Sequence, residues 1–164
     1  MSYEIIDNYL PPVVHENIYN FLIKNMFPWN FVDAVNSEDE DSNFLNNYYF
    51  IHLFYGKYKP ASDHFNLIVP LLNQLNPKSL MRIKANLYTR TENLVYHSQH
   101  VDYKFKHNGA IYYVNDNDGY TILHDGTKIE SVANRMLLFD ASRLHNSTNC
   151  TNAKVRCNIN FNFF

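Results

Sequence analysis

The first half of the chain carries apolar residues at helical spacing in two places. In residues 13–26 they recur three or four positions apart, which predicts an amphipathic helix with an apolar face of Val14, Ile18, Phe21, Leu22 and Met26. A second helical pattern covers residues 61–75, where Pro70 predicts a bend or a restart because proline removes a backbone donor. Residues 3–10 and the aromatic run 47–55 predict strands.

From residue 80 onward the pattern changes to strands and turns. Residues 80–90 alternate apolar and polar positions, which predicts a half-buried strand with Arg82, Lys84, Asn86 and Tyr88 on its polar side. Turns are predicted at DNDG (116–119) and at DG (125–126), because Asp-Gly is a strong hairpin signal. Further strands are predicted over residues 94–102, 109–115, 120–124, 127–132, 135–140 and 154–164.

Short strands at regular spacing are typical of a jelly roll. We therefore predict an α+β chain that is mainly β, a double-stranded β-helix (jelly roll) with N-terminal helices packed on one face. The 164 residues suit one domain. Within it, residues 1–80 are expected to form a helical and strand support, and residues 81–164 the jelly-roll core.

Composition and charge restrict the partners. The net charge is −2 and lysines and arginines form no dense cluster, so a nucleic-acid surface is not expected. No apolar run has the length of a membrane span, and no signal peptide is visible, so we expect no membrane partner. Cys150 and Cys157 predict two reduced thiols and a cytoplasmic location. The acidic segment 36–43 is interpreted as a solvated loop, with a mobile lid as the alternative.

Three residues in the second half could hold a metal. His100 and Asp102 are two positions apart, so an extended chain would place them on one face, whereas His97 should point away. His145 follows the apolar strand MLLF and could complete the set. Two imidazoles and one carboxylate are the ligands that non-haem Fe(II) oxygenases use. The remaining histidines are expected at the surface or at strand edges: His15, His52, His64, His107 and His124.

The last strand predicts a polar face next to this site. Arg156, Asn158, Asn160 and Asn162 alternate with the apolar residues of segment 154–164, and this face lines either solvent or a polar cavity. Arginine suits a carboxylate because its fork of N–H donors binds both oxygens. If Arg156 is buried, it requires an anionic partner.

Residues 81–164 resemble the catalytic core of the Fe(II)/2-oxoglutarate-dependent dioxygenase superfamily, near its prolyl-4-hydroxylase-like branch. The N-terminal half has no matching motif and only the general look of small phage and bacterial members. The resemblance is carried by ANLY, HVD, AIYYVND, DGYT, LLFD and the final strand with its basic residue. It departs from that branch where D-G precedes Tyr120 in place of G-G, and where Arg156 stands at a position that is Lys in some prolyl hydroxylases. The second departure loosens the branch assignment and leaves the chemistry intact.

The resemblance implies roles for eight residues. His100, Asp102 and His145 would bind Fe(II), and Arg156 with Tyr113 would bind the distal carboxylate of the co-substrate 2-oxoglutarate. Tyr88 would lie near the metal-proximal end of 2-oxoglutarate, and Thr121 and Asn158 in the same pocket. Ascorbate is a further expected cofactor.

The implied activity is hydroxylation of a substrate C–H bond, coupled to decarboxylation of 2-oxoglutarate to succinate. The expected substrate is a prolyl or other protein side chain, with a small metabolite as the alternative, and the expected location is the cytoplasm (the host's, if the source is a virus). Two alternatives from another class stay open: a non-catalytic jelly-roll binding module, and a cupin-like zinc protein, since zinc also accepts His and Asp.

Overall fold

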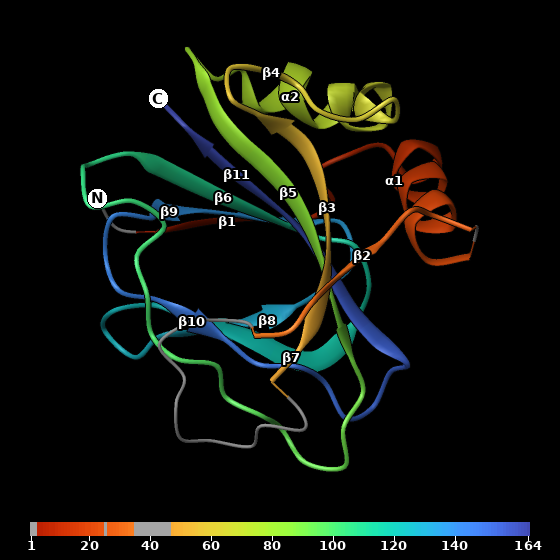
Figure 1. The fold of residues 1–164 in the computed structure, drawn as a ribbon, viewed down its shortest axis with the longest axis vertical. Helices are drawn as coiled ribbons and strands as arrows, with labels where there is room; N and C mark the ends of the chain where they lie inside the picture. The colour runs from red at the N-terminus through yellow and green to blue at the C-terminus, as the bar shows by residue number, and fades with distance from the viewer. Residues whose placement is uncertain (1–2, 25, 35–46) are drawn as a thin grey trace.

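The computed structural model describes residues 3–24, 26–34 and 47–164, which form two antiparallel sheets with helices on the outer face of the larger one (Figure 1). The larger sheet has the order β1-β9-β6-β11-β5-β3-β2, with β4 paired to β3, and the smaller has the order β10-β7-β8. The larger sheet contains β1 (Glu4–Ile6), β2 (Asn30–Val32), β3 (Tyr49–Gly56), β4 (Lys59–Pro60), β5 (Leu80–Thr89), β6 (Asn108–Tyr113), β9 (Arg135–Asp140) and β11 (Val155–Phe163). The smaller contains β7 (Asn117–Ile122), β8 (Lys128–Ser131) and β10 (Asn146–Ser147).

The larger sheet buries both of its faces. Its outer face packs against α1 (Pro12–Tyr19), the π-helix η1 (Asn20–Lys24), the 3-10 helix η3 (Phe65–Ile68) and α2 (Val69–Leu75) in one large apolar core. Its inner face forms a second, smaller apolar core with the β7–β8 sheet. The chain is therefore a jelly roll with helices on one face, as predicted.

Strand β11 is buried on both of its faces, one apolar and one polar. Cys157, Ile159 and Phe161 are buried in the core under the helices. Arg156 and Asn158 point to the other side and are also buried, so the polar face predicted for this strand lines the interior between the sheets. β11 pairs with β5 on one side and with β6 on the other, which places this polar face at the centre of the larger sheet.

The predicted helices are confirmed with changes at their ends. The first begins at Pro12 and continues as the π-helix to Lys24; Met26, expected on its apolar face, is fully exposed at 103%. The second is interrupted as predicted, because η3 ends at Ile68 and α2 restarts at Val69 with Pro70 in its first turn, where a missing N–H costs nothing.

The strand predicted over residues 94–102 is wrong. This segment forms only isolated bridges, Tyr96 to Thr148 and His100 to His145. Backbone groups of this segment form hydrogen bonds with side chains and loops, and not with the backbone of a neighbouring strand. For example, the backbone N–H of Val95 donates to the side-chain oxygen of Asn149.

The turn predicted at 116–119 is also wrong. Asn117 begins β7, and β6 pairs with β9 and β11 and not with β7. The acidic side chains here bind neighbouring loops instead, since Asp116 accepts from the N–H of Ala133 and Asp118 from that of Thr151. The D-G pair at 125–126 does connect a hairpin, β7 to β8, with Gly126 at φ 84. Short strands β2, β4 and β10 were not predicted.

Two sequence predictions are not tested by this fold. The acidic segment 36–43 lies outside the described residues. The division into a support (1–80) and a core (81–164) stays a prediction, although β1 and β3 lie in the same sheet as the later strands. Among the described helices, none combines the length and apolar character needed to span a membrane.

Candidate metal centre

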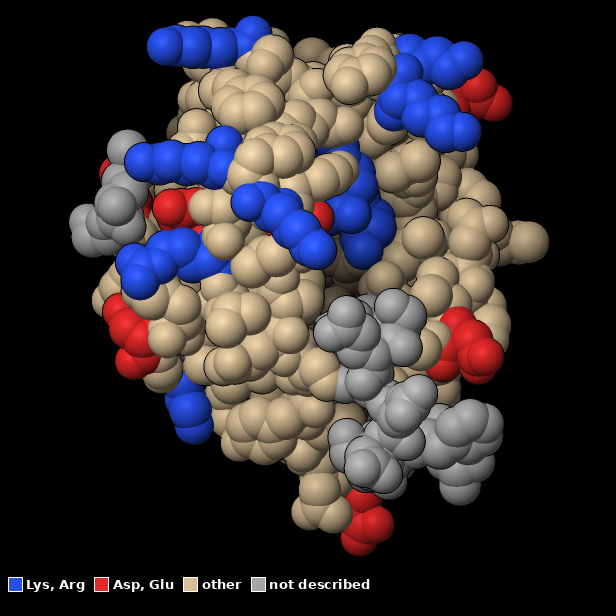
Figure 2. Space-filling view, turned by 60° about the vertical axis from the view of Figure 1, so that its left-hand side comes forward, with Lys and Arg blue, Asp and Glu red and all other residues tan. Residues whose placement is uncertain are grey.

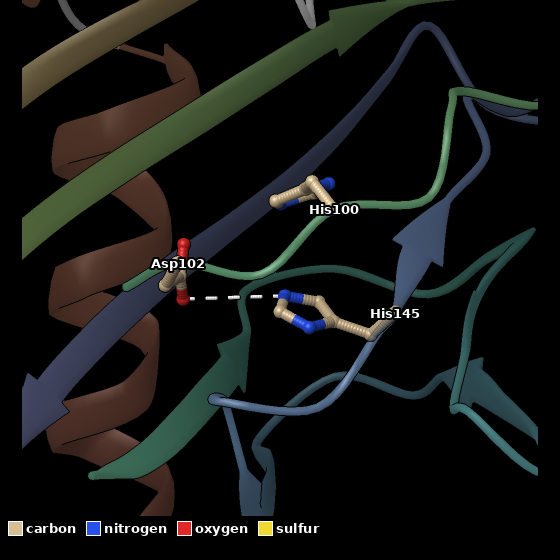
Figure 3. Close-up of side chains that lie close together, drawn as sticks. All are labelled: His100, Asp102 and His145. Atoms are coloured by element: carbon tan, nitrogen blue, oxygen red, sulfur yellow. Dashed lines mark ion pairs between the residues drawn. The ribbon is translucent and has the colours of Figure 1, made fainter. Parts of the chain in front are cut away.

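His100, Asp102 and His145 come together at one end of the space between the two sheets (Figure 3). The backbones of His100 and His145 form an antiparallel bridge, with N–H to carbonyl distances of 2.9 and 3.0 Å. The N–H of Asp102 donates to the carbonyl of Ala141 at 3.2 Å. Backbone bonds thus join two segments that are distant in the sequence, and they hold the three side chains side by side.

The side-chain geometry suits a shared cation. The possible ligand atoms of the three residues lie within 4.8 Å of one another, and His145 Nε2 is 4.0 Å from Asp102 Oδ2. In each histidine Nδ1 faces a backbone carbonyl, that of Ser98 for His100 (3.3 Å) and that of Arg143 for His145 (2.9 Å). A carbonyl can only accept, so Nδ1 carries the proton and Nε2 keeps its lone pair for a metal.

Asp102 is held as a carboxylate. Its Oδ1 accepts from Arg82 at 2.7 Å and its Oδ2 from Asn162 at 2.8 Å. Burial by itself would raise the pKa of Asp102, but the positive charge of Arg82, helped by His145 and Asn162, lowers that pKa below its usual value. Burial lowers the pKa of His145, so this imidazole is neutral near pH 7, as a ligand must be.

These ligands line a small cavity of about 50 Å³ between the two sheets. Figure 2 shows Lys and Arg side chains gathered beside a hollow on one face of the molecule. The cavity is lined from both sheets and from the segment that carries His100. The polar side chains on its wall include Lys84, Asn86, Thr121, Asn146, Arg156, Asn158 and Asn160.

Arg156 is completely buried (0% exposed) in the wall of this cavity. Its guanidinium donates to Ser131 Oγ (2.9 Å), the Thr148 carbonyl (3.1 Å) and Thr121 Oγ1 (3.2 Å). All three acceptors are uncharged, and no carboxylate within the described ranges forms an ion pair with Arg156. Three of its five N–H donors are used, so donors on both terminal nitrogens are left for a ligand.

The other predicted co-substrate residues surround Arg156. The guanidinium carbon lies 5.5 Å from the ring centre of Tyr88 and 5.9 Å from that of Tyr113. The Tyr113 hydroxyl donates to Thr121 Oγ1 at 2.8 Å. Thr121 therefore accepts from both Arg156 and Tyr113, and its own hydroxyl hydrogen is free to donate toward the cavity. Asn158, one of the weaker predictions, accepts from Asn86 Nδ2 at 2.9 Å and lines the same wall.

His97, expected to point away from His100, belongs neither to the candidate metal group nor to the cavity lining. It is buried, its ring stacks on Tyr88 at 4.9 Å, and Nδ1 is 3.0 Å from Ser147 Oγ. His52 and His107 were expected at the surface or at strand edges, and both are buried.

Several cavity residues were not singled out from the sequence. Lys84 and Asn86 belong to the polar side of β5, which was expected to be half-exposed and instead faces the cavity. Arg82 on the same side binds Asp102. The alternation was the available signal, but a strand pattern does not tell whether its polar side meets water or a cavity. Asn146 had no signal beyond its place after His145.

The donor set fits a redox-active divalent metal. Two neutral imidazoles and one carboxylate would leave open coordination positions on a six-coordinate ion, and the cavity gives a small molecule access to them. The same set does not exclude zinc, which also binds His and Asp. The buried cation at the other end of the cavity marks a place for an anionic group.

No protein-family model and no curated protein sequence matches this chain. Solved structures do match, over nearly its whole length. The viral collagen prolyl hydroxylase of Paramecium bursaria Chlorella virus 1, in complex with 2-oxoglutarate, is 13% identical with a TM-score of 0.65, and the match covers 99% of this chain and 94% of that one. A prolyl hydroxylase from Trichoplax adhaerens, in complex with a peptide of hypoxia inducible factor, is 13% identical with a TM-score of 0.66, covering 98% and 83%.

A third similar structure binds a different kind of molecule. HygX from Streptomyces hygroscopicus, with nickel, 2-oxoglutarate and hygromycin B bound, is 11% identical with a TM-score of 0.63, covering 98% of this chain and 82% of that one. At such identities the similarity establishes the fold, which is the jelly roll predicted from the sequence. One of these structures contains a peptide and another contains hygromycin B, so the substrate of this chain has to be inferred from its own residues.

Proposed function

We propose that this protein is an Fe(II)- and 2-oxoglutarate-dependent dioxygenase that hydroxylates a C–H bond of its substrate. His100, Asp102 and His145 would hold the iron, and Arg156 would bind the distal carboxylate of 2-oxoglutarate. With dioxygen as the oxidant, iron and 2-oxoglutarate bound there would supply the oxidising chemistry: one oxygen atom would go to the substrate as a hydroxyl and the other to succinate, with loss of CO2. Ascorbate would serve only as an accessory reductant.

The buried Arg156 is the observation that carries this proposal. Burying a guanidinium without a counter-charge is unfavourable, because the charged group loses its hydration. An anion that completes the hydrogen bonds of the guanidinium compensates for this loss. Arg156 is in the same cavity as the three possible metal ligands. A dicarboxylic keto acid matches this arrangement, since one end can chelate the metal while the other meets the arginine fork.

The remaining residues have supporting roles in this proposal. Tyr113 and Thr121 orient Arg156, and Thr121 would offer its hydroxyl hydrogen to the same carboxylate. Tyr88 covers the guanidinium, and Asn158 lines the wall between the arginine and the metal ligands. Arg82 and Asn162 hold the orientation of Asp102, so that one carboxylate oxygen is directed toward His145.

A non-catalytic or zinc-binding jelly roll is the alternative. The metal ligands by themselves are compatible with it, because zinc accepts the same donors. Such a protein has no use for a buried arginine facing the metal, nor for Tyr113 and Thr121 arranged around it. The geometry therefore favours the oxygenase. A prolyl or other protein side chain stays the substrate expected from sequence resemblance.

The test is oxygen-dependent formation of succinate from 2-oxoglutarate by the purified protein with Fe(II). We expect slow turnover even without a substrate, and loss of at least about a hundred-fold in His145→Ala, in line with removal of a group that the chemistry depends on. His124→Ala, an exposed histidine outside the cavity, serves as the matched control and should keep wild-type turnover.

Two outcomes would argue against the proposal. If the wild-type protein makes no succinate while it binds Fe(II), the binding-module interpretation would replace it. If His145→Ala keeps wild-type turnover and a native circular-dichroism spectrum, the metal site has been placed wrongly.

A further inference from the structure

Lys84 is a second cation in the wall of the same cavity, and it has no role in the proposed binding of 2-oxoglutarate. It lies on β5 directly opposite Asn160 of β11. Its Nζ donates to the Tyr49 hydroxyl at 3.2 Å and sits 5.3 Å from the centre of that ring. No carboxylate of the described segments forms an ion pair with it. Burial lowers the pKa of Lys84 to about 8, so the side chain is still mainly charged at pH 7.

The charges around the cavity do not balance without a further anion. Lys84 and Arg156 line it as cations, and Asp102 lines it as an anion that is already bonded to Arg82. These four groups sum to two positive charges. Fe(II) and 2-oxoglutarate would cancel each other when bound, so the excess would remain. A buried excess of positive charge is unfavourable, and an anionic substrate would reduce it.

The position of Lys84 separates it from the site proposed for 2-oxoglutarate. Arg156 is paired with Tyr88 in the strand register, and Lys84 lies four residues from Tyr88 along β5. The backbone positions of Lys84 and Tyr88 are therefore about 13 Å apart, at ~3.3 Å per residue. The five-carbon chain of 2-oxoglutarate spans only about 5 Å from its bond lengths. The charges that affect the pKa of Lys84 are those of Arg82 and Asp102. Lys84 is thus at the metal end of the cavity, where a substrate has to approach.

Amide oxygens on residues that line the same cavity as Lys84 point to hydrogen-bond donors on the same ligand. Asn146 is 7% exposed, and its Nδ2 donates to the carbonyl of His97 at 2.9 Å, which fixes the amide orientation. Its Oδ1 is buried without a partner in the described structure, and so is Oδ1 of Asn160. Both residues line the cavity. 2-Oxoglutarate carries only acceptors at neutral pH, so it satisfies neither oxygen.

We propose that the primary substrate is a small polar acid, whose anionic group is bound by Lys84 and whose N–H or O–H donors are accepted by Asn146 and Asn160. Lys84 is then the residue that determines specificity for a charged substrate over a neutral peptide unit. This inference rests on the proposed function, since it takes the metal ligands and Arg156 to be occupied by iron and 2-oxoglutarate.

The test uses three small probes of nearly equal size. N-acetylglycine carries a carboxylate and an N–H; 4-oxopentanoate has a CH₂ in place of that N–H; N-acetylglycinamide keeps the N–H but is neutral. Each is titrated, without oxygen, into the protein saturated with Fe(II) and 2-oxoglutarate, and the change in the visible band of the iron chelate is followed. We expect N-acetylglycine to bind most tightly. Relative to it, 4-oxopentanoate should bind several-fold more weakly, and the neutral N-acetylglycinamide at least about ten-fold more weakly.

Variants assign the effect to one side chain. Lys84→Met keeps a side chain of similar length and removes the charge. It should weaken the binding of N-acetylglycine at least about ten-fold, while the chelate band still forms. Lys84→Arg keeps the charge and should recover part of the binding. Lys104→Met, which removes an exposed lysine outside the cavity, is the matched control and should bind like the wild type.

The outcomes separate this inference from the proposed function. If no chelate band forms in the wild type, the proposed function fails first. If the band forms and the neutral amide binds as well as N-acetylglycine, or if no probe binds saturably, the acidic substrate is refuted. Equal binding of 4-oxopentanoate and N-acetylglycine would refute the role of the amide oxygens. If N-acetylglycine abolishes the band, or Lys84→Met prevents it from forming, Lys84 belongs to the 2-oxoglutarate site.

Discussion

Arg156 keeps its position because Gly119 has no side chain. Strand β7 passes directly over the arginine, and a Cβ on Gly119 would lie 2.6 Å from Cδ of Arg156. It would also collide with the backbone carbonyl oxygen of Asn149, which cannot move away easily. The D-G step in DGYT, noted in the sequence as a departure, therefore retains the one glycine that the arginine requires.

We predict that Gly119→Ala weakens 2-oxoglutarate binding about ten-fold and lowers the free energy of unfolding by about 1–3 kcal/mol, the usual cost of overpacking. The measurements are 2-oxoglutarate titration of the Fe(II) protein and urea denaturation. Gly56→Ala is the control, because its Cβ meets only the flexible side chain of Leu53, at 3.2 Å. Unchanged 2-oxoglutarate affinity in Gly119→Ala would show that the position of Arg156 does not depend on this contact.

Single residues were predictable from the sequence where a motif fixes their neighbours. His100 and Asp102 are two positions apart and His145 follows an apolar strand, and the structure brings all three together. Lys84 and Asn146 were not predictable in this way, because what makes them candidates is that Lys84 has no ion pair and that Oδ1 of Asn146 has no donor in the described structure. Such an absence depends on the packing of both sheets and leaves no trace in a local pattern.

At the scale of elements, the segment between β5 and β6 is the least regular part of the site. It carries His97, His100 and Asp102 and is held by isolated bridges and side-chain bonds in place of a strand pairing. Within this segment, His97 is buried against the larger sheet, where its ring stacks on that of Tyr88 in β5. Burial, followed by the nearby charges of Arg156 and His100, lowers the pKa of His97 to about 3.

This depressed pKa predicts a loss of stability in acid. Above the unfolded-state value of ~6.5, His97 is neutral in both states and contributes no pH dependence. Between ~6.5 and about 3 the unfolded chain takes up a proton and the folded chain does not, so stability falls as the pH falls. We expect this group to contribute a slope of up to about 1.4 kcal/mol per pH unit in that window.

Urea denaturation of the metal-free protein between pH 7.5 and 4.5 measures this slope. His97→Phe keeps an aromatic ring against Tyr88 but cannot titrate, so its slope should be smaller than that of the wild type. His124→Phe, at an exposed position, is the control. Parallel pH profiles of wild type and His97→Phe would mean that His97 is accessible to protons in the folded protein.

The elements themselves were predicted best where their period was long and regular. The alternation of residues 80–90 and 154–164 gave β5 and β11, the central pair of the larger sheet. The segments at 94–102 and 116–119 were predicted wrongly, because asparagine and aspartate side chains take over backbone hydrogen bonds there. Strands of two or three residues, such as β10, carry too short a pattern to be detected.

At the scale of the molecule, the candidate site joins parts that are distant in the sequence. β5, the segment carrying His100, the start of β10 and β11 each contribute to one cavity between the two sheets. Among the described residues, only Arg82 forms an ion pair with Asp102 at hydrogen-bonding distance, and the cations Lys84 and Arg156 have none. Ligands that bind here therefore connect both sheets and stabilise the folded chain.

We expect metal and 2-oxoglutarate to stabilise the whole fold, by about 2.7 kcal/mol at a hundred-fold excess over the dissociation constant. For a chain of this size this corresponds to a rise in Tm of roughly 5–10 °C. Calorimetry with Co(II), which does not oxidise readily, and 2-oxoglutarate measures the shift, and EDTA should reverse it. A Tm that does not respond to either ligand would contradict a site built across both sheets.

The overall architecture was predictable because few folds combine a helical region with many short strands after it, and the jelly roll is one of them. The pairing order was not predictable, since β1, from the N-terminus, joins β9, and β3 joins β5. These pairings depend on side-chain contacts between segments far apart, such as Asn134, which binds the backbone of Leu10. A local hydrophobic pattern specifies which face of a strand is buried and leaves its neighbour undetermined.

The central claim is that Fe(II) and 2-oxoglutarate bind together in this cavity, with Arg156 on the distal carboxylate. Its most direct test is anaerobic titration of the Fe(II) protein with 2-oxoglutarate, followed by the visible charge-transfer band of the chelate, in wild type and in Arg156→Met. We predict a saturable band in the wild type and a 2-oxoglutarate requirement at least about ten-fold higher in the variant. No band in the wild type, or identical titrations of the two proteins, would contradict the account.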